Sequence, residues 1–76
     1  LMLKNLKIIQ KILNENNKKK LKKTKNLDDF TWDSMTMITV ITILKDEYKK
    51  RNINVQKLRS LKSISDLDKF LSANIK

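Results

Sequence analysis

One serine in this 76-residue chain stands where a hydroxyl could carry a covalently attached group. Ser34 follows Asp33 and precedes a mostly apolar stretch that begins at Met35. If that stretch is a helix, Ser34 lies at its N-terminus, where the partial positive charge favours an attached phosphate. The alternative is purely structural, because Asp and Ser are also preferred residues for capping a helix start. The Asp33-Ser34-Met35 tripeptide leaves both interpretations open.

The composition removes most other catalytic chemistry. The chain has no cysteine and no histidine, which excludes disulfides, thiolate nucleophiles, histidine bases and the usual zinc ligands. We therefore predict a protein that is not an enzyme and that holds no metal ion. No apolar run approaches the ~18 residues of a membrane span, and no secretion-signal pattern occurs. We expect a cytoplasmic protein without a membrane span, and we interpret Leu1 as a remnant in front of a native start at Met2.

The charge of the chain supports a different hypothesis. The net charge is +10, and six lysines lie within residues 18–25. Such a run attracts phosphates, so the alternative function is a small basic helical module that binds nucleic acid or another polyanion. Against it, only two of the eighteen basic residues are arginine, and no aromatic residue for base stacking is interleaved with the lysines. We therefore do not expect nucleic acid to be the partner.

Apolar periodicity predicts an all-α fold with three longer helices and one short helix. The longer helices are expected over 2–13, over 35–50 and from about 63 onward, and the short helix over 55–61. Residues 15–33 are expected to form a long loop, and its part 15–25 is expected to be mobile because its lysines repel one another. Since the chain has neither glycine nor proline, helix ends are expected at asparagines, which tolerate the left-handed conformation.

The inward faces of these helices should form one small core, and the last helix should begin with a capping box. Ser63 is the expected N-cap of that helix, with Asp66 at its third position. The predicted core residues are Leu6, Ile9, Leu13, Val40, Ile41, Leu44, Tyr48, Ile53, Leu58, Leu61, Ile64, Leu67, Phe70 and Leu71.

These features together resemble the acyl carrier protein family, in which an Asp-Ser-Leu or Asp-Ser-Met motif opens the second helix. A first helix and a long loop precede Asp33-Ser34-Met35, and the second helix ends at an aromatic residue, Tyr48. Residues 64–71 are similar to the apolar and polar pattern of the family's last helix. The resemblance covers nearly the whole chain, and it implies a single carrier domain, 1–76, folded as a four-helix acyl-carrier-protein-like bundle.

The resemblance also implies a function. A phosphopantetheinyl transferase would attach 4′-phosphopantetheine from coenzyme A to the Ser34 hydroxyl, with Asp33 beside the phosphate. The resulting phosphoprotein would hold an acyl or aminoacyl group as a thioester. It would present this group to loading and acyl-transferring enzymes of lipid or secondary metabolite biosynthesis. A monomeric, non-catalytic carrier is the expectation.

The chain differs from the family in its charge. Members are usually acidic along the second helix, where basic partner enzymes dock, whereas here Thr36 and Thr39 are expected at exposed positions and Lys45 replaces another acid. We therefore expect partners that grip apolar side chains, in a dedicated pathway rather than in general fatty-acid synthesis. The expected contact residues are Trp32, Met35, Thr36, Ile38 and Thr39.

Overall fold

The computed structural model describes residues 3–75 of the chain. The predictions for Leu1 and Met2 lie outside the described residues. Residues 3–5, also predicted as helix, are not helical, since the first helix begins only at Leu6. Within residues 3–75 the protein has four α-helices and no strand, which confirms the all-α prediction of three longer helices and one short helix. The helices are α1 (Leu6–Leu13), α2 (Ser34–Tyr48), α3 (Val55–Ser60) and α4 (Ile64–Ile75).

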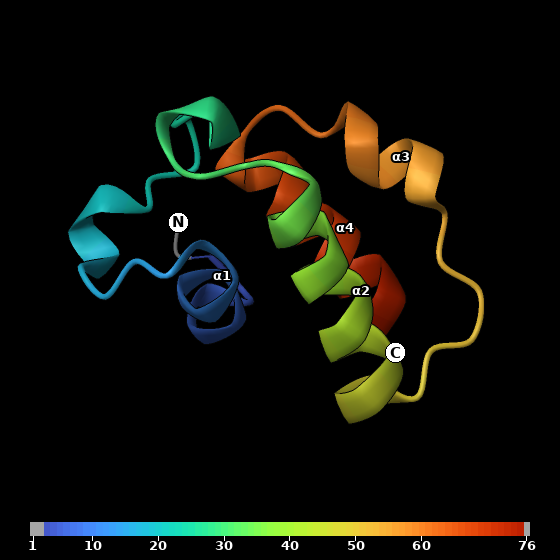
Figure 1. Cartoon of the computed structure of the whole chain (residues 1–76). Helices are drawn as coiled ribbons and strands as arrows, with labels where there is room; N and C mark the ends of the chain where they lie inside the picture. Colours follow the sequence, from blue (N-terminus) through green and yellow to red (C-terminus); the bar gives the residue numbers. More distant parts are fainter. Residues whose placement is uncertain (1–2, 76) are drawn as a thin grey trace.

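The three longer helices pack against one another, and α3 lies at the edge of the molecule, on the side away from α1 (Figure 1). Most of the predicted core is buried at their meeting point, including Ile9 in α1, Leu44 in α2 and Leu67 in α4. The remaining predicted core residues are half-buried and pack against this centre: Leu6, Ile41, Tyr48, Ile53 and Leu61. Within residues 3–75, no helix combines the length and apolarity needed to cross a membrane.

Four buried apolar side chains were not predicted: Ile12, Leu21, Leu27 and Ile43. Ile12 and Ile43 widen the inward faces of α1 and α2 beyond the positions that the periodicity selected. Leu21 and Leu27 lie in the long connection between those helices, where no periodic pattern marks an isolated apolar residue as buried. Each is at most 4% exposed, so the connection contributes to the core.

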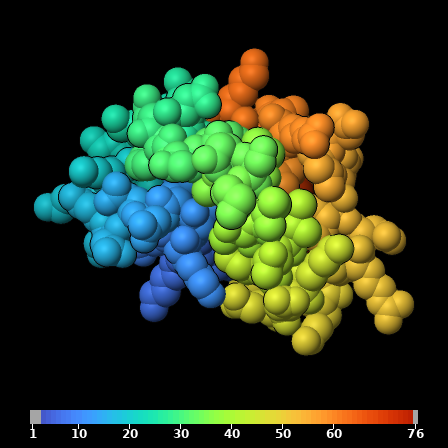
Figure 2. All heavy atoms as spheres, in the orientation of Figure 1, coloured from blue at the N-terminus to red at the C-terminus, as the bar shows by residue number. Residues whose placement is uncertain are grey.

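The connection 15–33, whose part 15–25 was predicted to be mobile, has local structure and hydrogen bonds to the rest of the molecule. It contains two 3-10 turns, Lys18–Lys20 and Leu27–Asp29. Its second half is bonded to the start of α4, since the backbone N–H of Leu27 donates to the Lys62 carbonyl at 2.7 Å and that of Ile64 to the Lys25 carbonyl at 2.9 Å. The six lysines remain exposed, so water screens the repulsion that suggested a mobile loop. Figure 2 shows the first part of this segment, coloured light blue to teal, on the side of the molecule opposite α3.

The helix ends follow the expected chemistry in part. Asn14 ends α1 in the left-handed conformation, with φ of 53°, as expected for an asparagine. The second helix ends earlier than predicted, because Lys49 adopts the left-handed conformation with φ of 57°. The capping box of α4 is confirmed, since the Asp66 N–H donates to Ser63 Oγ at 3.1 Å and the Ser63 N–H donates to Asp66 Oδ2 at 3.2 Å.

Candidate functional site at the start of α2

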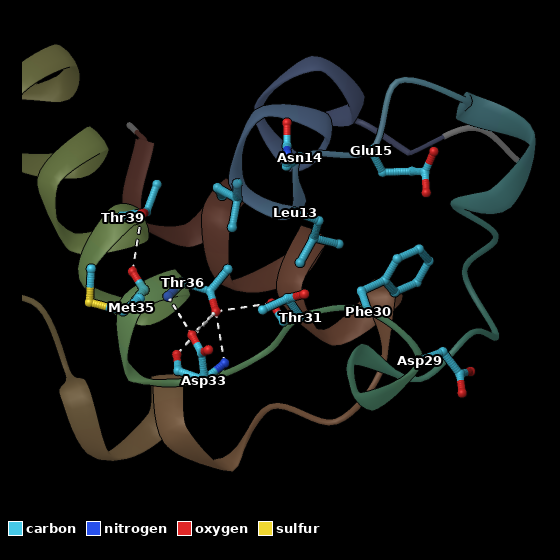
Figure 3. A pocket seen from close by; sticks show the side chains of 11 residues that line it. Leu13, Asn14, Glu15, Asp29, Phe30, Thr31, Asp33, Met35, Thr36 and Thr39 are labelled. Atoms are coloured by element: carbon cyan, nitrogen blue, oxygen red, sulfur yellow. Dashed lines mark hydrogen bonds between the residues drawn. The ribbon is translucent and has the colours of Figure 1, made fainter.

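Asp33 and Thr36 form a reciprocal cap at the start of α2. The Thr36 N–H donates to Asp33 Oδ1 at 3.0 Å, and the Asp33 N–H donates to Thr36 Oγ1 at 2.7 Å. The Thr36 hydroxyl also lies within hydrogen-bond distance of the Thr31 carbonyl, at 3.0 Å (Figure 3). These bonds join the segment that precedes α2 to the first turn of the helix. The direction in which the chain enters α2 is therefore fixed by neighbouring residues in the sequence.

This cap overturns the prediction for Thr36. The residue was expected on the exposed face as a partner contact, but it is only 7% exposed. The reason is that threonine at the third helical position turns its hydroxyl back to the cap. The expectation for Thr39 also needs correction, because this residue is half-buried and its hydroxyl donates to the Met35 carbonyl at 3.0 Å.

The cap holds Asp33 in its ionised form. The backbone N–H of Thr36, followed by the Thr36 hydroxyl, lowers the pKa of the Asp33 carboxyl below its usual value of 3.8, since both hydrogen bonds favour the charged form. Asp33 is the N-cap, so the structural role that the sequence offered to either residue belongs to Asp33.

Ser34 is the first residue of α2, and its side chain is exposed. Within the described part of the chain its hydroxyl makes no hydrogen bond with another protein group. A free hydroxyl at the positive end of a 15-residue helix is accessible to an enzyme and favourably placed for a phosphoester.

Two apolar side chains are exposed in the first turns after Ser34. Met35 is 70% exposed and Ile38 is 53% exposed, consistent with their predicted availability for contact. Trp32 differs, because it is half-buried and packs against the core. Its indole N–H is buried and has no hydrogen-bond partner among the described residues. The apolar surface beside Ser34 therefore consists mainly of Met35 and Ile38.

A cleft of about 690 Å³ opens beside Ser34, whose two neighbours in sequence, Asp33 and Met35, both line it (Figure 3). It lies between the end of α1, the chain around Phe30 and the first turns of α2. Its other acidic lining residues, Glu15 and Asp29, come from separate parts of the connection and were not predicted as site residues. Within residues 3–75, no three acidic side chains are grouped closely enough to hold a metal ion.

A second groove, of about 540 Å³, lies along the other half of α2. Ile41 and Lys45 of α2 form one side of it, and residues 51–55 form the other. Ile41 is about two helical turns beyond Ser34, ~10 Å along the axis. The groove therefore lies farther along the same helix that begins at Ser34.

Comparison with known proteins does not assign a family. No family model matches the chain, and neither a curated protein nor a solved structure matches it significantly. Function is therefore inferred from Ser34 and its surroundings.

Proposed function

We propose that this chain is a phosphopantetheine-dependent carrier protein of the acyl carrier type, with Ser34 as the attachment residue. The observation that carries the proposal is the division of roles at the start of α2. Asp33 and Thr36 form the cap, whereas the Ser34 hydroxyl is exposed and unused beside an open cleft. Asp33 supplies the cap, so the capping bonds of this helix start do not use the Ser34 hydroxyl.

The protein's own residues would present the hydroxyl and stabilise the product. In the active site of a separate transferase, Ser34 Oγ would form a bond to the phosphorus that bears the pantetheine arm while the pyrophosphate P–O bond of coenzyme A breaks. A base of the transferase would take the hydroxyl proton, and adenosine 3′,5′-bisphosphate would leave. The capped first turn keeps Ser34 accessible, and the helix N-terminus favours the new phosphoester. The attached group supplies a terminal thiol, which this cysteine-free chain lacks.

The two hollows along α2 fit a carrier role. Both fall within the ~300–1,000 Å³ that small-molecule sites usually occupy. The cleft beside Ser34 suits the polar arm, because Asp33, Thr31 and Thr39 contribute to its lining. The groove farther along α2 has Ile41, Ile53 and Val55 in its lining, and an apolar cargo would find shelter there.

We assign partner contact to Met35 and Ile38. They are exposed next to Ser34, and exposed apolar side chains beside a reactive group are typical of interaction sites. The exposed Lys45 on the same helix would oppose an enzyme surface rich in lysine and arginine. The exposed Asp46 and Glu47 next to it would attract such a surface. The proposal of a less basic partner, in a dedicated pathway, therefore rests on Lys45 and on the threonines, rather than acids, at 36 and 39.

Intact mass tests the attachment. The protein is incubated with coenzyme A and a promiscuous phosphopantetheinyl transferase, and we expect one added phosphopantetheine. Ser34→Ala should gain nothing, whereas Ser60→Ala, which removes another exposed serine, should be modified like the parent. A parent protein that stays unmodified with several such transferases, while circular dichroism shows it folded, would overturn the proposal.

Transfer kinetics test the partner surface separately. We expect the double change Met35→Ser and Ile38→Ser to slow modification of Ser34, because the enzyme loses its apolar contact. Val55→Ser is the matched control, since Val55 is also exposed (40%) but lies on α3. Equal rates for both variants would remove Met35 and Ile38 from the contact surface.

A further inference from the structure

A third hollow, of about 470 Å³, lies where residues 18–24 pass the beginning of α1. It shares no lining residue with the cleft beside Ser34, and its properties do not depend on the proposed function. We call it the leucine–lysine trough. Its lining residues are Leu3, Leu6, Lys18, Leu21, Lys22, Lys23 and Thr24.

The apolar part of the trough consists of three leucines held by the fold. Leu21 is 4% exposed, and its N–H donates to the Lys18 carbonyl at 3.1 Å. Leu3 and Leu6 are half-buried, so each still offers apolar surface. The chain between them is tied to α4, because Asp68 accepts the N–H groups of Lys4 and Asn5 at 3.1 and 2.9 Å. The apolar lining is therefore preformed rather than a chance feature of a free loop.

The charged part of the trough is cationic only. Lys18, Lys22 and Lys23 are exposed, and no acidic residue among residues 3–75 lines the trough. The ion pair found among the described residues joins Lys11 to Glu47, well outside the trough lining. The carboxylate oxygens of Asp68 already accept the hydrogen bonds at the start of α1. The three ammonium groups thus repel one another around an apolar surface, and an anion would relieve this repulsion.

We propose that the leucine–lysine trough binds a single-chain anionic amphiphile, a free fatty carboxylate, with its chain on the leucines and its carboxylate among the lysines. The hollow has the size of a small-molecule site, and its lining combines apolar leucines with exposed lysines. A neutral lipid would leave the lysines without a counter-charge. A nucleic acid would leave the leucines uncovered and would find no aromatic residue for stacking in the trough.

The test uses the full chain and monomeric ligands below their micelle concentrations. Amide chemical shifts of the ¹⁵N-labelled protein are followed during titration with octanoate, decanoate and dodecanoate. We expect saturable binding, with shifts centred on residues 3–6 and 18–24. Each added methylene should tighten binding by up to about fourfold until the trough is filled. Dodecanol and dodecyltrimethylammonium supply the neutral and cationic comparisons, and both should bind more weakly.

Charge variants separate the trough from the general basic character of the loop. Lys22→Glu with Lys23→Glu should weaken dodecanoate binding at least about tenfold, because two attractions become repulsions. Lys19→Glu with Lys20→Glu makes the same change of charge in exposed lysines that do not line the trough, and it should have a much smaller effect. All four positions are exposed, so both double variants should fold.

Several outcomes would overturn the proposal. They are equal weakening by the two double variants, dodecanol binding as tight as dodecanoate binding, and shifts centred on the groove at residues 51–55. Binding to anionic phospholipid vesicles is measured as a last comparison. If vesicles bind the protein while monomeric dodecanoate does not, the lysines serve a membrane surface and the trough is not a fatty-carboxylate site.

Discussion

A carboxylate accepts backbone N–H groups near the start of both α1 and α2, but it caps the helix itself only at α2, and the two carboxylates come from different distances along the chain. At α2 the acceptor is Asp33, and its partner Thr36 is three residues away. At α1 the acceptor is Asp68 of α4, which binds the N–H groups of Lys4 and Asn5 across 64 and 63 residues. The side-chain amide of Asn5 donates hydrogen bonds to Asp68 Oδ1 and to Ser72 Oγ, each at 2.9 Å.

This difference shows that the region that exposes Ser34 and the contacts that hold the helices together depend on different hydrogen bonds. The start of α2 is a local structure, so the region around Ser34 keeps its geometry through bonds within six residues. The start of α1 depends on the assembled bundle, because its carboxylate is buried on another helix. Damage to the Asp68 contact should therefore affect global unfolding, whereas damage to the α2 cap should act mainly on the first turn of that helix.

The largest effect is expected for Asp68→Ala. The substitution leaves the N–H groups of Lys4 and Asn5 without an acceptor, and each unpaired, partly buried group costs about 1–3 kcal/mol. We expect the free energy of unfolding in urea to fall by about 2–4 kcal/mol. Asp28→Ala makes the same charge change at an exposed residue and should alter stability by less than about 0.5 kcal/mol. Similar losses in both variants would mean that Asp68 acts only through its charge.

A smaller effect is expected for Thr36→Val, which keeps the side-chain volume but removes the hydroxyl of the α2 cap. Loss of a helix cap costs about 1 kcal/mol, and urea unfolding should show a decrease of that size. Thr42→Val changes an exposed threonine on the same helix and is the matched control. If Thr36→Val is as stable as its control, the cap seen at Asp33 contributes nothing to folding.

Substitutions at the C-terminal ends of the same two helices should increase the stability of the protein rather than decrease it. Lys49→Gly should stabilise the protein by ~0.5–1 kcal/mol, because a left-handed residue with a Cβ is strained and glycine is not. Asn14→Gly should gain less, since asparagine already tolerates that conformation. Thermal unfolding of the two variants measures the difference. A larger gain at Asn14 than at Lys49 would contradict this assignment of strain.

The smallest expected effect is a pH dependence of the unfolding free energy, caused by the helix caps at Asp33 and Asp66. The pKa values of Asp33 and Asp66 are lowered from 3.8 by hydrogen bonds, led by the backbone N–H groups of Thr36 and Ser63 respectively. Groups with a depressed folded pKa add stability above the unfolded value, and this stability is lost as pH falls through the folded value. Unfolding free energy attributable to them should be constant well above pH 3.8 and decline below it.

Asp33→Asn and Asp66→Asn each remove one titrating cap, so each should reduce the decline in unfolding free energy between about pH 5 and pH 2. Both variants must be compared with the parent at pH 7, where the parent caps are ionised. An acid decline that is unchanged in both variants would place the titrating groups elsewhere.

Periodicity in the sequence predicted the helices and most of the core, because an amphipathic pattern reports which face of a helix is inward. The Ser63–Asp66 cap was also predictable, since its two partners are three residues apart. The exposure of Thr36 was predicted wrongly for a related reason: Thr36 belongs to a cap whose pattern, Asp-x-x-Thr, differs from the commoner Ser-x-x-Glu form. That local pattern was present in the sequence and would have corrected the prediction.

The sequence by itself determined the helical class, the basic charge and the position of Ser34 at the start of a helix, because each depends on residue type and short spacing. Tertiary structure alone decided that Leu21 and Leu27 are buried, that Asp68 holds the start of α1, and that three separate segments form the cleft beside Ser34. The physical reason is range. Caps and helix faces form between residues within a turn or two, whereas burial of an isolated leucine or a distant carboxylate depends on which segments the whole chain brings together.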